Sequence, residues 1–231
     1  MRRGAAAVAT GAALLVSSCA GGASPGQVVR FRTEDGIRLA GELRGSGPTG
    51  VVLAHMFATD RTSWSELASL LADRGYRSLA LDFRGYGASG GERDITAIWR
   101  DVLSAVDALR DRGARSIVLV GASMGGTASL IAASRTEVQG VVTLSAPGTF
   151  MGLSAPAPVL QAVDEPKLFI AAQGDGSAAA TAQTFYETAS GAKRLEVVTG
   201  ADHGTDLLEG RQGEAVRRFI LDFLAGLPGQ P

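Results

Sequence analysis

The chain contains very little cysteine and histidine, and this scarcity restricts its chemistry. Its 231 residues include one cysteine, Cys19, so an intrachain disulfide and a cluster of cysteine metal ligands are both excluded. Two histidines, His55 and His203, are the candidates for any chemistry that needs an imidazole. The net charge of −1 gives no basis for binding nucleic acid. We expect no nucleic-acid partner, no metal and no other cofactor.

The apolar run near the N-terminus is too short to cross a bilayer. Arg2 and Arg3 precede an apolar stretch at residues 5–16, which is the pattern of a secretory signal peptide. The next segment, "LVSSC", resembles the lipobox of bacterial lipoproteins, in which the cysteine is lipidated and becomes the new N-terminus. Val16 stands where leucine is commoner. We expect Cys19 to carry the lipid, with an ordinary secretory signal and an incidental cysteine as the alternative.

These features divide the chain into four parts. Residues 1–18 are the expected lipoprotein signal peptide, 19–26 a flexible tether, 27–226 one folded domain, and 227–231 a short tail. A composition of 45% apolar and 19% charged residues is sufficient for one sizeable domain with a core. The expected location is the outer face of a bacterial cell membrane after export, with the lipid as the sole contact with the membrane.

Strands and helices alternate along the domain. Strands are expected at residues 28–33, 37–43, 51–55, 76–82, 116–120, 140–144, 167–172 and 194–198. Helices are expected at residues 63–74, 94–112, 124–133, 178–190 and around 216–224. This alternation predicts an α/β fold with a doubly wound, mostly parallel eight-stranded sheet. The insert at residues 146–165 is too short for a large lid.

The segment "VLVGASMGGTA", residues 118–128, places Ser123 between a strand and a helix. In the pattern G-x-S-x-G, Gly121 and Gly125 remove side chains that would clash across a sharp turn, which leaves the serine Oγ exposed above the sheet. The following helix N-terminus offers N–H groups and a positive dipole to an oxyanion. A dinucleotide-binding loop is the rival interpretation. It is disfavoured because the loop does not follow the first strand and the next strand ends in no acidic residue.

Asp175 and His203 follow two later strands, so the order along the chain is Ser, Asp, His. This order resembles that of the α/β-hydrolase superfamily. Five segments carry the resemblance: "VVLAHMF", "LALDFRGYGASGG", "VGASMGG", "KLFIAAQGD" and "GADHGTDLL". The resemblance extends over nearly the whole expected mature chain, which looks most like the small, lidless members related to dienelactone hydrolases and prokaryotic esterases or lipases.

The resemblance implies a catalytic triad. Ser123 would be the nucleophile, His203 the base and later the acid, and Asp175 the group that orients the imidazole. Glu165 is the nearest substitute for the acid, but it precedes its strand and would point to the wrong end of the sheet. Asp202 is adjacent to the histidine in the sequence, so its carboxylate would have difficulty in reaching the second nitrogen of the imidazole ring.

The resemblance also implies an oxyanion hole made of two backbone N–H groups, those of Met124 and Phe57. Met56 is the alternative to Phe57, because the family commonly has His-Gly where this chain has His55-Met56, and glycine permits backbone angles that methionine resists. His55 itself is expected to be a structural residue of this turn. Arg84 is expected to brace its loop.

The expected function is that of a serine hydrolase that cleaves small-molecule carboxylic esters through an acyl-enzyme. Thioesterase, peptidase and acyltransferase activities use the same triad and remain alternatives. A non-catalytic surface lipoprotein that kept the fold is a further alternative. The acyl and alcohol groups of the substrate and the oligomeric state are open at this point.

Overall fold

The computed structural model describes Met1 and residues 26–229. The expected signal peptide, Cys19 and nearly all of the tether lie outside the described residues. The regular elements begin with a strand at Gln27 and end with a helix at Ala225.

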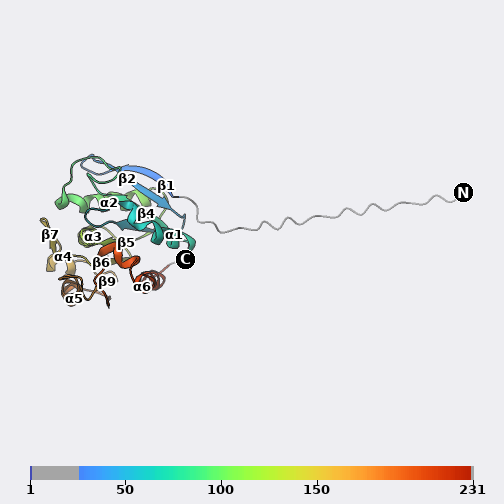
Figure 1. Cartoon of the computed structure of the whole chain (residues 1–231). Coiled ribbons are helices and arrows are strands. Elements are labelled where there is room, and N and C mark those ends of the chain that lie inside the picture. The colour runs from blue at the N-terminus through green and yellow to red at the C-terminus, as the bar shows by residue number, and fades with distance from the viewer. Residues whose placement is uncertain (2–25, 230–231) are drawn as a thin grey trace.

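An eight-stranded sheet forms the centre of the domain, in the order β1-β2-β4-β3-β5-β6-β9-β10 (Figure 1). Its strands are β1 (Gln27–Arg32), β2 (Arg38–Arg44), β3 (Thr49–Ala54), β4 (Arg77–Asp82), β5 (Ser116–Ala122), β6 (Gly140–Leu144), β9 (Lys167–Ala172) and β10 (Lys193–Val198). β2 runs antiparallel to both of its neighbours, and all other neighbouring pairs are parallel.

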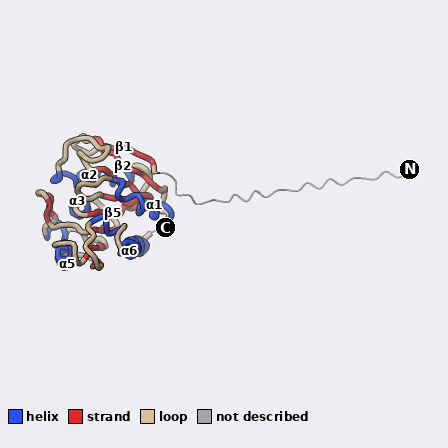
Figure 2. The backbone as a smooth tube through the Cα atoms, in the orientation of Figure 1, coloured by secondary structure: helices blue, strands red, loops and turns tan. Residues whose placement is uncertain are grey.

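Helices cover both faces of this sheet. α1 (Ser65–Asp73) and α6 (Gly213–Ala225) pack on one face and share an apolar cluster with it. α2 (Ile98–Arg110), α3 (Met124–Ala133) and α5 (Ala178–Thr188) bury their apolar sides in a second cluster on the other face. β1 and β2 lie at one edge of the sheet, and α5 and α6 lie toward the other (Figure 2). The predicted doubly wound, mostly parallel fold is confirmed.

The sequence pattern explains which elements are central. β3, β6 and β9 are buried at every position, as continuous apolar runs covered on both faces should be. α2 is amphipathic and exposes one side, whereas every residue of α3 is buried. The helix that follows Ser123 therefore lies inside the molecule.

Two predicted helices begin with a turn of 3-10 helix. η1 (Arg61–Trp64) precedes α1, and η2 (Ile95–Ala97) precedes α2. The N-cap of η1 is Asp60, whose carboxylate accepts the Thr62 N–H at 2.8 Å. Asp94 caps η2 in the same way, through the N–H of Thr96.

The insert at residues 146–165 contains small elements that the sequence did not predict. They are a two-stranded ribbon, β7 (Thr149–Phe150) and β8 (Leu153–Ser154), and a short helix, α4 (Ala157–Gln161). Elements of two and five residues are too short to produce a recognisable periodicity. Met151 and Gly152 form the ribbon's turn with positive φ angles of 46° and 88°.

The two ends of the described domain lie on the same side, away from the ribbon β7–β8 (Figure 1). β1 and β4 are both antiparallel to β2, so β1 runs in the direction of the parallel strands. Gln27 therefore lies at the amino edge of the sheet, opposite the edge where the parallel strands end. In residues 26–229, none of the helices combines the length with the apolar composition that a membrane crossing requires.

Candidate active site

Ser123 occupies a strained turn between β5 and α3. Its backbone angles, φ 49° and ψ −122°, lie in a region that residues other than glycine rarely adopt. A Cβ at Gly121 would lie 2.3 Å from the carbonyl oxygen of Gly125, and a Cβ at Gly125 would lie 2.3 Å from that of Ala54. Both positions must therefore be glycine for the turn to close.

The structure brings the three predicted side chains together. The Nε2 atom of His203 lies 2.9 Å from Oγ of Ser123. The Nδ1 atom of the same ring lies 2.8 Å from Oδ2 and 3.0 Å from Oδ1 of Asp175. A carboxylate accepts hydrogen bonds, so Nδ1 carries the ring proton and donates a hydrogen bond to Asp175, and Nε2 is the nitrogen that can accept the serine hydroxyl proton.

These residues come from loops that follow β5, β9 and β10. Their side chains therefore meet at the edge of the sheet where the parallel strands end, as expected for an open α/β sheet. The side chain of Asp175 is 14% exposed and that of His203 is 44% exposed. The imidazole of His203 can therefore be reached from solvent, whereas Ser123 itself is only 5% exposed.

The two alternative acids lie elsewhere. The backbone carbonyl of Glu165 accepts a hydrogen bond from Nζ of Lys167 at 2.6 Å, at the beginning of β9. That position is at the amino edge of the sheet, as expected from the sequence. The carboxylate of Asp202 lies against Gly210. In the described part of the chain, no hydrogen bond joins either carboxylate to His203.

The two residues predicted as oxyanion donors belong to the start of α3 and to the loop after β3, the strand next to β5. Met124 is the first residue of α3, so its N–H is one of the free donors at a helix N-terminus. Phe57 lies in the turn after β3, next to the packing of Gly125 on Ala54. The positive φ of this turn, 61°, falls on Ala58 rather than on Met56. The turn therefore accommodates a methionine where the family commonly has glycine.

A family model described as the Alpha/beta hydrolase family matches residues 51–228. The matched range includes the serine turn, Asp175 and His203. The chain belongs to this family.

Relatives of this hydrolase include proteins of several descriptions. YfhR of Escherichia coli K12, an uncharacterized protein, is 25% identical over 226 residues, which cover 85% of this chain and 79% of YfhR. Epoxide hydrolase A of Mycobacterium tuberculosis is 40% identical over 128 residues, 51% of this chain and 38% of that protein. A carboxylesterase of Bacillus subtilis is 30% identical over 104 residues, 44% of this chain and 42% of that protein.

Solved structures share the fold of the hydrolase. An esterase from Pyrococcus furiosus superposes with a TM-score of 0.75 at 19% identity, covering 88% of this chain and 92% of its own. A dienelactone hydrolase from Anabaena variabilis gives a TM-score of 0.75 at 22% identity, covering 87% of this chain and 97% of its own.

The other histidine of the hydrolase is built into its core. His55 is fully buried, and its Nδ1 lies 2.7 Å from the carbonyl oxygen of Met56. Its Nε2 accepts the N–H of Phe83 at 3.2 Å. The ring centroids of Phe83 and Tyr86 lie 4.7 and 5.0 Å away. Burial lowers the pKa of His55, which keeps the ring neutral. His55 is a structural residue, as expected, because both nitrogens bond the backbone.

Arg84 of the hydrolase braces its loop, also as expected. Its Nη2 lies 2.7 Å from Oδ1 of Asp101 on α2, and its Nη1 lies 2.8 Å from Oδ2 of Asp35 in the β1–β2 turn. The hydrogen bond from Arg84 lowers the pKa of Asp35 to about 2. Burial raises the pKa of Asp101, and its bonds to Arg84 oppose that rise. The sequence did not single out Asp101.

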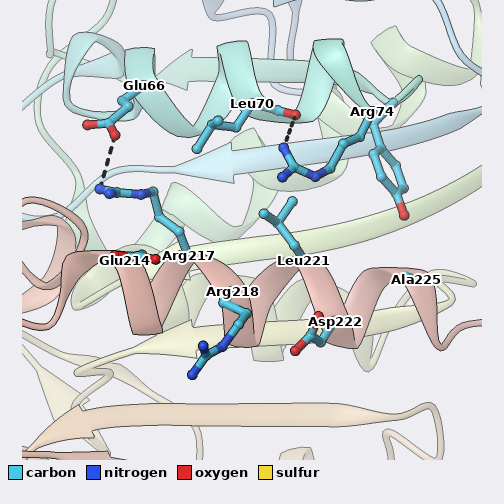
Figure 3. A pocket seen from close by; sticks show the side chains of 10 residues that line it. Glu66, Leu70, Arg74, Glu214, Arg217, Arg218, Leu221, Asp222 and Ala225 are labelled. Atoms are coloured by element: carbon cyan, nitrogen blue, oxygen red, sulfur yellow. Dashed lines mark hydrogen bonds and ion pairs between the residues drawn. The ribbon is translucent and has the colours of Figure 1, made fainter.

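The hollow between α1 and α6 does not offer a competing site. One of about 670 Å³ lies between α1 and α6, where Leu70 and Leu221 face each other (Figure 3). Its charged groups include the ion pair of Arg217 with Glu66 at 3.0 Å, and no nucleophile lies beside a base there. Within residues 26–229, no three His, Cys, Asp or Glu side chains gather in a way that would hold a metal ion.

Proposed function

We propose that this chain is a serine hydrolase that cleaves carboxylic esters through an acyl-enzyme intermediate. The observation that carries the proposal is the continuous hydrogen-bonded series from Ser123 through His203 to Asp175. A serine hydroxyl is a weak nucleophile until a base takes its proton, and an imidazole placed at 2.9 Å with a carboxylate behind it supplies that base.

The reaction would proceed in two halves. His203 takes the proton of Ser123 as Oγ attacks the carbonyl carbon, and the N–H groups of Met124 and Phe57 stabilise the resulting oxyanion. The protonated imidazole then gives its proton to the departing alcohol, which leaves an acyl group on the serine. Water enters, His203 takes a proton from it, and the same steps release the carboxylic acid. Asp175 orients the imidazole and stabilises its charged form.

The names of the relatives include epoxide hydrolases as well as a carboxylesterase. The chemistry of Ser123 favours the ester. Attack of a serine oxygen on an epoxide carbon would form an ether, which has no carbonyl for water to attack, and the enzyme would remain modified. Attack on an ester forms a second ester, which the same His203 and oxyanion hole can hydrolyse.

Thioesterase, peptidase and acyltransferase activities would use the same residues. Thioesterase and peptidase activities differ from ester hydrolysis in the leaving group, so matched thioester, anilide and ester substrates of one acyl group separate them. Acyl transfer differs in the final acceptor, so product analysis with an added alcohol separates it from hydrolysis. We propose the ester because a carboxylesterase is among the relatives and an esterase is among the solved structures that share the fold. A non-catalytic role is disfavoured, because a binding surface has no need of Ser123 and His203 aligned at an exposed edge.

We also propose that the chain is exported and held at the outer face of a bacterial membrane by a lipid on Cys19. The "LVSSC" segment and the preceding apolar run support this location. Since the tether would join β1 at the amino edge of the sheet, the opposite edge with Ser123 would face away from the membrane.

A fluorophosphonate probe tests the nucleophile. We expect one label on the protein, placed on Ser123 by peptide mapping and lost in Ser123→Ala. Ser145 offers a matched control, because it follows β6 with a similar positive φ of 51° and is buried without a hydrogen bond to its Oγ in the described residues. Ser145→Ala should be labelled as the wild type is. A label on any serine other than Ser123, or no label, would exclude the proposed mechanism.

A further inference from the structure

A pair of aromatic rings bridges the loops on either side of the serine turn. β5 lies between β3 and β6 in the sheet, so the loops that follow β3 and β6 flank the turn that follows β5. Phe57 belongs to the first loop and Phe150 to the ribbon in the second. Their ring centroids lie 5.4 Å apart at an interplanar angle of 62°, an edge-to-face contact. The rings therefore join the two loops beside the N-terminus of α3.

The ribbon that carries Phe150 is fixed to the helix behind Ser123. Oγ1 of Thr127, in the first turn of α3, donates to the carbonyl oxygen of Pro147 at 2.6 Å. A Cβ at Gly126 would lie 2.8 Å from Cβ of Ala146, so the two backbones approach closely. At the other end of the ribbon, Gly152 packs against the side chain of Thr96. These contacts hold the ribbon in place next to the serine.

Each of these two loops carries an exposed apolar side chain. Phe57 is 41% exposed and Met151, at the tip of the ribbon, is 64% exposed. Within residues 26–229, the other exposed large apolar side chains are Val28 on β1 and Val197 on β10, which lie singly on the two edge strands of the sheet. An apolar patch beside a nucleophile is the kind of surface on which an apolar part of a substrate binds.

The position of His203 decides which part of the ester this surface receives. Gly204, next to the histidine, lies against Met56 and Ala122, and Leu207 and Leu208 belong to the apolar cluster on the α1 and α6 face. Phe150 packs on the cluster of the opposite face, with α2 and α3. The departing alcohol must lie near His203 to receive its proton. The acyl group therefore extends away from His203, toward the ribbon that carries Phe150.

We infer that Phe57, Phe150 and Met151 form the wall that binds the acyl chain, and that the preferred substrates are esters of an unbranched apolar acid several carbons long. The inference rests on the proposed ester hydrolysis. Each methylene that such a wall removes from water raises kcat/KM by up to about fourfold. The wild type should therefore prefer p-nitrophenyl hexanoate to p-nitrophenyl acetate, and it should discriminate against acyl groups that end in a charge.

The test compares three variants of the full-length protein. Phe150→Ala should lower kcat/KM for p-nitrophenyl hexanoate about tenfold and change that for the acetate by less than about twofold. Met151→Asn introduces a residue that tolerates a positive φ and removes the apolar side chain at the tip of the ribbon. It should therefore lower the ratio of kcat/KM for the hexanoate to that for the acetate without destabilising the fold. Val197→Ala removes an exposed apolar side chain on β10 and is the matched control, with no change for either ester.

A second series separates the acyl side from the alcohol side. Hexyl acetate carries its chain on the alcohol, so Phe150→Ala should leave its hydrolysis unchanged relative to ethyl acetate. Equal losses for hexanoate and acetate, or a loss for hexyl acetate as large as for the hexanoate, would overturn the acyl wall while fluorophosphonate labelling of Ser123 leaves the proposed function standing. A wild type that neither cleaves the acetate nor reacts with the probe would overturn both.

Discussion

Oγ of Ser123 lies 2.9 Å from Nε2 of His203, although 80 residues of chain separate them. The contact depends on the serine turn, because a strained backbone at Ser123 points the hydroxyl out of the sheet edge toward the histidine loop. No movement of either element is needed to align the pair. Such preorganisation is what a general base requires before the substrate arrives.

The acid of the triad can be identified by kinetics. Replacing Asp175 with Asn should lower kcat about 10⁴-fold, because the amide no longer holds the imidazole with the proton on Nδ1. Glu165→Gln and Asp202→Asn are the matched controls and should remain within about twofold of the wild type on p-nitrophenyl acetate. A loss in Asp202→Asn comparable with that in Asp175→Asn would mean that the carboxylate role has been misassigned.

The serine turn makes a prediction about stability. Gly125→Ala should lower the free energy of unfolding by about 1–3 kcal/mol, because its Cβ would lie 2.3 Å from the carbonyl oxygen of Ala54 and the two elements must separate. Gly148→Ala is the control, since a Cβ there meets nothing closer than 3.9 Å. Urea unfolding measures both. Equal midpoints for the two variants would contradict the close approach.

Much of this architecture could be predicted because it has a regular pattern. The eight strands were visible as apolar runs, and Ser123, Asp175 and His203 were visible as polar residues placed directly after strands. The helix ends were less predictable, since Asp60 and Asp94 cap short 3-10 turns that share the composition of the helices they precede.

The remaining features depend on contacts between distant residues. Asp101 lies within the amphipathic pattern of α2, and only its burial against Arg84 distinguishes it from an ordinary exposed carboxylate. Phe150 belongs to a two-residue strand, and its contact with Phe57 joins loops far apart in sequence. Neither contact leaves a periodic signal, because each is set by how the loops fold over the sheet.

His55 makes a prediction about pH. Its pKa is lowered by burial from an unfolded value of about 6.5, so its contribution to stability is complete above that pH and is lost as the pH falls toward the folded pKa. The wild-type free energy of unfolding should therefore decline from pH 7 to pH 5, with at most about 1.4 kcal/mol per pH unit from this group. His55→Gln should be less stable at pH 7 and should decline less steeply.

Urea unfolding at several pH values measures this slope, and activity supplies the control. A general base must be neutral, so activity should fall at acid pH, and this fall is the acid limb of the pH–activity profile. General-base catalysis by His203 does not involve the buried ring of His55. His55→Gln should therefore keep the acid limb even if its rate is reduced. If the limb disappears in His55→Gln and remains in His203→Gln, the base is His55 and the proposed triad is wrong.

The lipid anchor makes the final prediction. Cys19→Ala should leave a protein without the lipid, which either moves from the detergent phase to the aqueous phase in a phase-partition experiment or keeps its signal peptide uncleaved, because a lipidated cysteine is the proposed membrane contact. Its kcat/KM for p-nitrophenyl acetate should stay within about twofold of the wild type, since the tether meets β1 at Gln27, on the amino edge of the sheet, and Ser123 lies beyond the carboxyl end of β5. A wild type found in the aqueous phase would refute the anchor. A variant released from the membrane with a large loss of activity would instead mean that the membrane lies close enough to the serine edge to take part in substrate binding.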